Sequence, residues 1–316
     1  MAVYLVTGGA GFIGSHIVDE LARRGERVRV LDNFSSGHRE NLEPALRNPG
    51  ADVEVIEGDI RDREAVRQAV NGADYVLHHA AMVSVPGSVA DPLTTNEVNV
   101  TGTLNVLQAV REAHGAGVKR LVFASSSAVY GNDLTVPKRE EMPLAPLSPY
   151  AASKASGEMY CRVFYEMYGL PTVALRYFNV FGPRQDPASQ YAAVIPRFIT
   201  ALLCHERPTI YGDGAQSRDF IYVANVVQAN LLACEKDHAV GQVMNVACGE
   251  RCTLLDLYRD LAELTGTTLQ PIFAPARAGD VKHSVAAVNR LAQLLDYAPA
   301  VDRKEGLRRT MEWYAS

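Results

Sequence analysis

The chain has 316 residues, of which 47% are hydrophobic and 21% are charged. This composition excludes a disordered or fibrous protein and fits one compact unit or two closely fused lobes. The formal net charge is −5, and Lys and Arg are scattered without a long basic run, which argues against nucleic acid as a partner. No segment is long and apolar enough to span a bilayer, so no membrane association is expected.

Five cysteines lie at positions 161, 204, 234, 248 and 252. They form no Cys-x-x-Cys pair of the kind that binds zinc or carries redox chemistry, and an odd number does not make a closed set of disulfides. We therefore expect a reducing, cytoplasmic setting and no metal site. The first residues run straight into an apolar strand and lack the basic start and the cleavage site of a signal peptide.

Short β-branched runs alternate with amphipathic stretches of helical length. Strands are expected over residues 3–7, 28–31, 53–57, 75–78, 121–124 and 172–175, and helices over residues 12–24, 63–70, 101–113 and 150–168. The alternation predicts an α/β fold with a doubly wound parallel sheet covered by helices on both faces. Beyond Asn179 the pattern loosens, which indicates a smaller second lobe. Residues 225–234 and 242–246 could return a helix and a strand to the main sheet.

A glycine-rich turn, with Gly8, Gly11 and Gly14, lies between the first strand and the first helix. Without side chains there, the backbone can approach a pyrophosphate, and the free N–H groups of the helix start attract its charge. Asp32 ends the second strand about twenty residues on, where a carboxylate can accept both hydroxyls of a ribose. Asn33 follows it, and not an arginine that would favour a 2′-phosphate, so NAD is favoured over NADP. Taken alone, the glycines could form only a tight turn.

Tyr150 and Lys154 stand four residues apart, and Pro149 before them marks a helix start. On a helix these two side chains share a face. A phenol titrates near pH ~10 and needs a nearby cation before it can act as a base at neutral pH. Lys154 can supply that charge, and a cationic oxidised nicotinamide would lower the pKa of Tyr150 further. Taken alone, the spacing also fits a surface helix pair.

Other polar residues follow the strand ends. Ser125, Ser126 and Ser127 close the fifth strand, where a hydroxyl can share a proton with a substrate oxygen. Asp59 follows the third strand and could flank an adenine, while Asn99 is expected to begin a helix. Singly, such residues are more often helix caps or satisfied polar groups of the core than ligands.

Together these residues resemble the extended short-chain dehydrogenase/reductases and, among them, the nucleotide-sugar epimerases. The resemblance covers essentially the whole chain. It rests on residues 7–14, 32–33, 59, 79–81, 125–131, 150–154, 176–179, 212–214, 218–220 and 277–280. It implies an NAD-binding Rossmann domain over residues 1–178, to which residues 222–248 return, and a smaller α/β lobe over residues 179–221 and 249–316 that binds a UDP-sugar.

The resemblance also implies roles for individual residues. Tyr150 is the implied catalytic base, Ser126 assists it, and Lys154 holds the nicotinamide ribose and tunes the base. The implied NAD-binding residues are Gly8, Gly11, Phe12, Ile13, Gly14, Asp32, Asn33, Ser36, Asp59, Ile60, His79, Ala80, Ala81, Asn99, Ser125, Tyr150, Lys154 and Tyr177. The implied substrate-binding residues are Ser84, Ser126, Asn179, Val194, Tyr211, Arg218, Arg277, Asp280 and Ser284.

Some of these positions bear on the substrate. Arg218 and Arg277 look like clamps on the substrate diphosphate, although a surface ion pair of Arg218 with Asp219 would also account for that arginine. Ser284 stands where a bulky tyrosine restricts the sugar pocket in some relatives, and a small residue there leaves room for an N-acetyl group. Ser84 could help to line that space.

Two positions depart from related patterns. Relatives that dehydrate the sugar carry an Asp-Glu pair directly after the catalytic hydroxyl residue, whereas this chain has Ser127 and Ala128. The chain therefore lacks the acid and the base that dehydration of the sugar requires. Val83 stands where some hexose-specific relatives have a lysine near the cofactor, so that contact is in doubt.

The implied activity is NAD-dependent 4-epimerisation of a UDP-hexose, plain or N-acetylated, through a 4-keto intermediate. Epimerisation or decarboxylation of a UDP-uronate starts with the same oxidation and stays open, as does a catalytically idle sensor of NAD or UDP-sugar. Relatives pair through helices near residues 101–113 and 150–168, so a homodimer is implied. Apolar Met159, Val163 and Met167 are compatible with that contact and equally with core packing.

Overall fold

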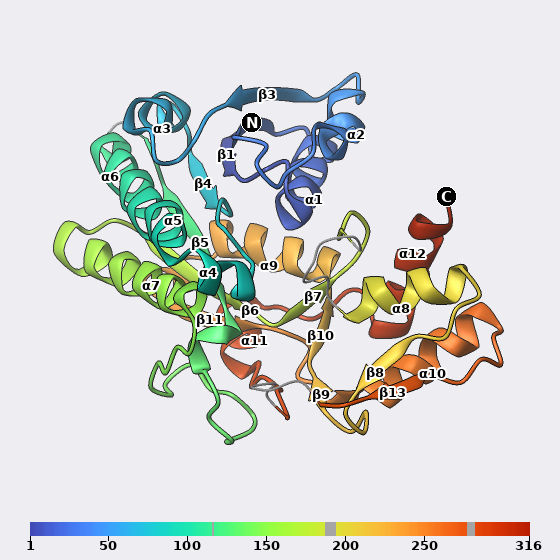
Figure 1. Ribbon diagram of the computed structural model, residues 1–316. Helices are drawn as coiled ribbons and strands as arrows, with labels where there is room; N and C mark the ends of the chain where they lie inside the picture. The colour runs from blue at the N-terminus through green and yellow to red at the C-terminus, as the bar shows by residue number, and fades with distance from the viewer. Residues whose placement is uncertain (116, 187–193, 277–281) are drawn as a thin grey trace.

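The computed structural model describes residues 1–115, 117–186, 194–276 and 282–316. Seven strands form its main sheet in the order β11-β6-β5-β4-β1-β2-β3, and every neighbouring pair is parallel (Figure 1). The strands are β1 (Val3–Thr7), β2 (Arg27–Asp32), β3 (Asp52–Glu57), β4 (Tyr75–His78), β5 (Arg120–Ser126), β6 (Thr172–Tyr177) and β11 (Val243–Val246). The predicted doubly wound parallel α/β sheet is confirmed.

Helices cover both faces of this sheet. One face carries α1 (Phe12–Arg23), α9 (Val223–Glu235) and α11 (Asn289–Leu295), and the other carries α3 (Arg63–Val70), α6 (Gly102–His114) and α7 (Pro149–Tyr168). Alternate residues of a strand enter the two cores, so that Tyr4 and Val6 lie in the first and Leu5 in the second. Burial on both faces explains why these strands are nearly continuous apolar runs.

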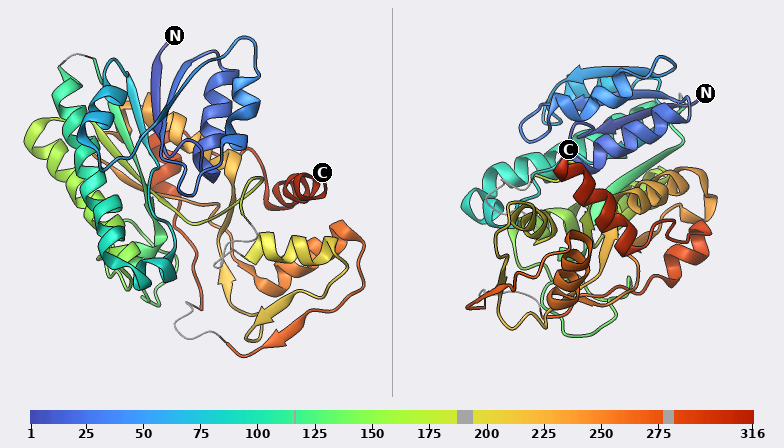
Figure 2. Two further views of the ribbon diagram at one scale, coloured as in Figure 1. Left: turned by 45° about the horizontal axis from the view of Figure 1, so that its top comes forward. Right: turned by 90° about the vertical axis from the view of Figure 1, so that its right-hand side faces the viewer.

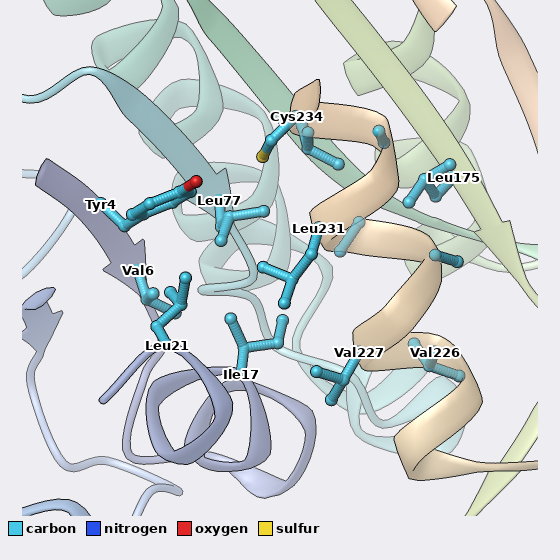
Figure 3. Packing of buried hydrophobic residues seen from close by; sticks show 14 of the residues in the cluster. Tyr4, Val6, Ile17, Leu21, Leu77, Leu175, Val226, Val227, Leu231 and Cys234 are labelled. Atoms are coloured by element: carbon cyan, nitrogen blue, oxygen red, sulfur yellow. The ribbon is translucent and has the colours of Figure 1, made fainter. Parts of the chain in front are cut away.

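The first core is built by α1 and α9 against the strands (Figure 3). Ile17 and Leu21 of α1 lie near Val227 and Leu231 of α9, beside Val6 of β1, and all five side chains are buried. Burying an aliphatic side chain of this size stabilises a fold by ~1.5–3 kcal/mol. This packing fixes α1, and with it the preceding glycine-rich turn, on the sheet.

A smaller lobe follows the carboxyl end of β6 and has its own core, which includes Phe198, Ile210 and Leu257. Its strands are β7 (Asn179–Phe181), β8 (Thr209–Tyr211), β9 (Ser217–Arg218), β10 (Phe220–Tyr222), β12 (Cys252–Thr253) and β13 (Ile272–Ala274), and its helices are α8 (Val194–Leu203), α10 (Leu254–Thr265) and α12 (Arg303–Ala315). Figure 2 shows the lobe to one side of the main sheet, with the C-terminus on α12. After β10 the chain returns to the sheet, where β11 pairs with β6.

Shorter helical segments complete the described chain. They are η1 (Arg39–Leu42), α2 (Glu43–Leu46), α4 (Val85–Ala90), α5 (Pro92–Asn96), η2 (Glu97–Thr101), η3 (Ser127–Tyr130) and η4 (Asp237–Ala239). The expectation that Asn99 begins a helix is wrong, because Asn99 lies inside η2, a π-type turn that joins α5 to α6. β-Branched residues and a glycine lower the helix propensity of this stretch, so its conformation is determined by tertiary contacts and not by the local sequence. Across the parts of the chain that the structure describes, no helix is long and apolar enough to cross a membrane.

Candidate active site

The strand order reverses between β1 and β4, and sheets of this kind bind ligands in the crevice at such a switch point. β1 ends directly before Gly8, and β4 ends directly before His79 and Ala80. Gly8 has a φ of +69°, and a Cβ atom there would lie 2.7 Å from the backbone nitrogen of Ala80. The two strand ends therefore meet backbone to backbone, and only glycine fits at this position.

The glycine-rich turn leads into α1 without a side-chain cap. Gly11 is the N-cap residue, and no side chain of the described residues caps the first turn. A Cβ atom on Gly14 would lie 2.2 Å from the carbonyl oxygen of Gly8, so the turn and the helix also pack backbone to backbone. Uncapped N–H groups at the positive end of the helix dipole suit a phosphate or pyrophosphate.

Carboxylates line the next part of the crevice. The two oxygens of Asp32 accept hydrogen bonds from the backbone N–H groups of Ala10 (2.9 Å) and Phe34 (2.8 Å), and each oxygen has a further lone pair. The side chain of Asn33 donates to Asp59 at 2.8 Å. Hydrogen bonds from Arg61, and then from Asn33, lower the pKa of Asp59 to about 2. This region can accept hydrogen bonds from ribose hydroxyls.

Tyr150 lies in the first turn of α7, and several side chains hold that turn in place. The backbone N–H of Tyr150 donates to the hydroxyl of buried Ser88 at 3.1 Å, and Ser153 donates to the Tyr150 carbonyl at 2.7 Å. Asn99 donates from Nδ2 to Ser153 (2.9 Å) and to the carbonyl of Met82 (3.0 Å), and its Oδ1 accepts from the Met82 N–H at 2.7 Å. Asn99 therefore ties the loop after β4 to α7.

Ser126 and Tyr150 are hydrogen-bonded at the carboxyl end of β5, and Lys154 binds the same strand end. Burial raises the pKa of the Tyr150 phenol, while its hydrogen bond with Ser126 acts in the opposite direction. Lys154 is buried, donates from Nζ to the carbonyl of Ala124 at 2.7 Å, and has its pKa lowered to about 8 by burial. A phenol and a hydroxyl that share a hydrogen bond, with an ammonium group at the same strand end, can move a proton to or from a bound substrate hydroxyl.

A chain of hydrogen bonds fixes the ring of Tyr177 at the end of β6. Asn230 donates from Nδ2 to the carbonyl of Val226, so its Oδ1 accepts the Tyr177 hydroxyl at 2.9 Å. The Tyr177 oxygen then accepts from Nε2 of His79 at 2.9 Å. Burial lowers the pKa of His79 to about 4, so this imidazole is neutral. Tyr177 ends β6 and His79 follows β4, so both residues lie at the carboxyl edge of the main sheet.

The hydroxyl of Ser125 is used inside the protein. It donates to Glu158 of α7, a buried carboxylate that also pairs with Arg176 at 2.7 Å. Arg176 donates further to the hydroxyl of Tyr130 at 2.8 Å. The sequence had not indicated Ser88 or Glu158, although Glu158 lies four residues after Lys154 and so shares its helix face.

A pocket of about 420 Å³ lies in the smaller lobe between β7, α8, β8 and β9. It brings together Asn179, Val194, Tyr211 and Arg218, four residues that the sequence implied for substrate binding. Five further polar residues that the sequence had not indicated also line it, namely Arg197, Glu206, Arg207, Thr209 and Gln216. The combination of guanidinium, amide and aromatic groups suits a nucleotide with a charged diphosphate.

Asp219 has a structural function beside this pocket. Its carboxylate is fully buried and accepts from the backbone N–H groups of Cys248 (2.9 Å), Gly249 (3.0 Å) and Ala286 (3.1 Å). A surface ion pair with Arg218 is therefore not the role of Asp219. Arg218 itself donates from one guanidinium nitrogen to the carbonyl of Ser217 at 2.9 Å.

The remaining implied residues lie at several places. Ser84 caps α4 by accepting from the N–H of Gly87 at 3.0 Å, and Ser36 is exposed in the loop after β2. Ile60 is a core residue packed against Gly102, where a Cβ atom would lie 2.6 Å from the Ile60 side chain. Ser284 is hydrogen-bonded to β9. Phe12 and Ile13 follow the glycine-rich turn, and Ala81 follows β4. Arg277 and Asp280 lie outside the described residues.

Solved structures of high similarity span nearly the whole chain. The UDP-N-acetylglucosamine 4-epimerase of Methanobrevibacter ruminantium, in complex with UDP-N-acetylmuramic acid, is 44% identical with a TM-score of 0.93, over 99% of this chain and 98% of that one. The UDP-glucose 4-epimerase of Thermotoga maritima with UDP-glucose is 40% identical with a TM-score of 0.91, over 99% and 98%. The UDP-glucose 4-epimerase of Thermus thermophilus in complex with NAD is 40% identical with a TM-score of 0.86, over 99% of each chain.

Related sequences point the same way and include a second activity. The UDP-glucose 4-epimerase of Mycolicibacterium smegmatis is 38% identical over 98% of this chain and 97% of its own length. A UDP-N-acetyl-alpha-D-glucosaminuronate decarboxylase of Bacillus cytotoxicus is 32% identical over 98% and 97%. The model of the NAD dependent epimerase/dehydratase family matches residues 4–247. The resemblance to nucleotide-sugar epimerases of the extended short-chain dehydrogenase/reductases is thus confirmed, and the chain belongs to the NAD dependent epimerase/dehydratase family.

Proposed function

We propose that this protein interconverts the C4 epimers of a UDP-hexose with NAD as its cofactor. The observation that carries the proposal is the hydrogen bond between Ser126 and Tyr150 at the carboxyl end of β5, where Lys154 also binds, on the same sheet edge as the uncapped glycine-rich turn. In this proposal residues 1–178 and 222–248 hold NAD, and residues 179–221 and 249–316 hold the UDP-sugar.

The crevice residues fit NAD. The glycine-rich turn leaves backbone N–H groups for the pyrophosphate, and Asp32 keeps lone pairs for the adenosine ribose. Asn33 beside it offers no cation for a 2′-phosphate. When bound, NAD accepts a hydride from C4 of the sugar and returns it. Lys154 and Tyr177 are proposed to flank the nicotinamide half.

The residues of the chain move the proton. Tyr150 takes the proton of the C4 hydroxyl, directly or through Ser126, and the ammonium group of Lys154 stabilises the resulting phenolate. Loss of this proton and of the C4 hydrogen leaves a 4-keto sugar. The same phenol returns the proton after the sugar has presented its other face, so the two half-reactions use one set of groups.

The nucleotide must stay bound while the sugar turns. Asn179, Tyr211 and Arg218 line the pocket proposed for the UDP, and Arg277 and Asp280 are proposed to complete it. Binding energy from the nucleotide then keeps a mobile sugar within reach of Tyr150.

The proposed substrates include N-acetylated sugars. Ser284 has a small side chain and is hydrogen-bonded through its N–H to Ser217, the residue before Arg218. A small side chain there leaves room beside the sugar for an N-acetyl group. The similarity to a UDP-N-acetylglucosamine 4-epimerase supports this assignment.

A homodimer through α6 and α7 is part of the proposal. Met159, Val163 and Met167 of α7 are 56%, 46% and 72% exposed, so the alternative that they pack in the core is wrong. Val89 and Leu93, on the neighbouring helices α4 and α5, are also exposed. An apolar face of this kind is typical of a surface that a second copy covers.

The test is to incubate the purified protein separately with UDP-glucose, UDP-N-acetylglucosamine and UDP-glucuronate, and to resolve the products by chromatography and proton NMR. Conversion of either of the first two to its galacto-configured partner supports the proposal. Turnover of UDP-glucuronate alone would indicate that this protein acts on a UDP-uronate, as the name of the decarboxylase relative suggests for that protein. Binding of NAD and UDP-sugar with no product over long incubation would identify a sensor without catalysis.

A further inference from the structure

Three side chains outside the proposed catalytic group, those of Ser217, Arg251 and His283, join β9 to residues 282–284. Ser217 of β9 is fully buried, and its Oγ lies 2.9 Å from Nδ1 of His283. Arg251, the residue before β12, donates from Nε to the same Oγ at 3.1 Å. A second nitrogen of Arg251 lies 3.3 Å from Nδ1 of His283. The guanidinium group thus bridges the serine and the histidine.

The contacts of Ser217 Oγ hold the imidazole and the guanidinium group together. A guanidinium group can only donate, so Ser217 Oγ accepts from Arg251 and makes its other hydrogen bond with Nδ1 of His283. The second nitrogen of Arg251 lies 3.3 Å from Nδ1 and 3.5 Å from Nε2, so the guanidinium group lies against the imidazole ring.

Backbone hydrogen bonds continue the same contact. The N–H of Ser217 donates to the carbonyl of Lys282 at 2.9 Å, and the N–H of Ser284 donates to the carbonyl of Ser217 at 3.0 Å. Ser217 and His283 are paired residues of a parallel bridge, so the next residues, Arg218 and Ser284, share the opposite side. Arg218 lines the UDP-sugar pocket.

We infer that Arg251 and His283 are positioning residues, which act through Ser217 to hold Ser284 at a fixed distance from Arg218 and so set the sugar pocket. The inference rests on the proposed function, because it assumes that the pocket beside β9 takes a UDP-sugar. It adds a specificity-determining element that makes no contact with the reacting atoms.

The charges around His283 make this contact sensitive to pH. The charged groups that face it are Arg251 from the loop before β12, Arg218 from β9 and Lys282 from its own segment, and all three are cations. Burial and these cations lower the pKa of His283. A protonated imidazole would add a positive charge beside these three cations, so acid weakens the contact.

The test measures binding of UDP-N-acetylglucosamine by calorimetry at pH 8.0, 6.5 and 5.0, together with KM and kcat for the plain and the acetylated sugar. Arg251→Gln is expected to weaken binding and raise KM by ~5–10-fold, the scale of one lost charge-assisted hydrogen bond, with kcat within about twofold. Arg251→Lys, which keeps one donor, is expected to recover part of the loss. The matched control is Arg259→Gln on α10, where the arginine side chain is exposed and pairs only with Asp256 among the ion pairs of the described residues.

The pH series separates positioning from general stability. The wild type is expected to lose affinity between pH 6.5 and 5.0, whereas His283→Asn, which keeps an acceptor that does not titrate, is expected to lose less; the loss that remains is assigned to Asp219, whose pKa burial raises to about 6 and which binds the N–H of Ala286. Equal affinities of Arg251→Gln, His283→Asn and the wild type at every pH would overturn the inference and leave the proposed function standing. No binding by the folded wild type would overturn both.

Discussion

At the scale of single residues, the proposed chemistry depends on one phenol oxygen. Tyr150→Phe keeps the ring and its packing but removes the group proposed to exchange the C4 hydroxyl proton. We expect kcat to fall by at least ~10²–10⁴-fold while NAD and UDP-sugar binding persist. The rate is measured by product chromatography, and binding is measured by calorimetry.

Tyr160→Phe, on the same helix, is the matched control and should leave kcat unchanged. An undiminished rate for Tyr150→Phe would contradict the assignment of the base. A parallel loss of binding would indicate a packing defect in place of a missing proton acceptor.

At the scale of elements, α1 and the turn before it work as one unit. In Gly14→Ala the new methyl group would lie 2.2 Å from the Gly8 carbonyl oxygen, so the turn and α1 must move apart. We expect NAD affinity to fall by more than ~10-fold, because the proposed pyrophosphate site is made of that backbone. Fluorescence titration with NAD and thermal unfolding measure the effect.

Gly115→Ala serves as the control for Gly14→Ala. Gly115 has a helical φ of −67° at the end of α6, and an added Cβ would meet no atom of the described residues within 4 Å. Its NAD affinity should match the wild type. If Gly14→Ala also bound NAD normally, the backbone cradle would not be the cofactor site.

The helix α7 carries different residues on its two faces. Lys154 and Glu158 face the sheet, whereas Met159, Val163 and Met167 are exposed. Val163→Glu puts a charge into the proposed contact between two copies, and we expect it to turn a dimer into a monomer in sedimentation velocity. Leu134→Glu, at an exposed apolar position on another surface, should stay dimeric. A monomeric wild type, or a dimeric Val163→Glu, would contradict the proposed interface.

At the scale of the whole molecule, a buried neutral histidine makes stability depend on pH. His78 accepts from the Thr7 hydroxyl at 2.7 Å and contacts the Thr103 hydroxyl at 3.0 Å, and burial lowers its pKa to about 3. In the unfolded chain its pKa returns to about 6.5. Between these values the unfolded chain binds a proton that the folded protein does not, so stability is lost as the pH falls from 6.5 toward 3.

Because of this linkage, the free energy of unfolding should fall by ~2 kcal/mol per buried histidine between pH 7 and pH 5. His16 and His79, whose pKa values burial lowers to about 4, act in the same direction. Urea unfolding followed by circular dichroism measures the change, and His78→Gln should reduce it. An unfolding free energy that is equal at both pH values would contradict the buried neutral state.

Local sequence signals predicted the main sheet but not its supporting contacts. The βαβ alternation and the glycine-rich turn are properties of neighbouring residues, and the main-sheet strands up to β6 and the helices α1, α3, α6 and α7 follow from them, whereas the short helices α2, α4 and α5 were not predicted. The π-type turn at Asn99 and the Ser88 contact with Tyr150 arise between segments far apart in the chain. The same holds for Ser217, Arg251 and His283, whose pairing depends on how the lobe folds.

The most direct test of the account follows a single hydrogen atom. UDP-N-acetylglucosamine carrying deuterium at C4 of the sugar is incubated with the protein in ordinary water, and the product is analysed by proton NMR and mass spectrometry. The account predicts a galacto-configured product that retains the deuterium at C4, because the hydride leaves C4 and returns to it without exchange. An epimer that has lost its label to water, or no epimer from any UDP-hexose, would contradict it.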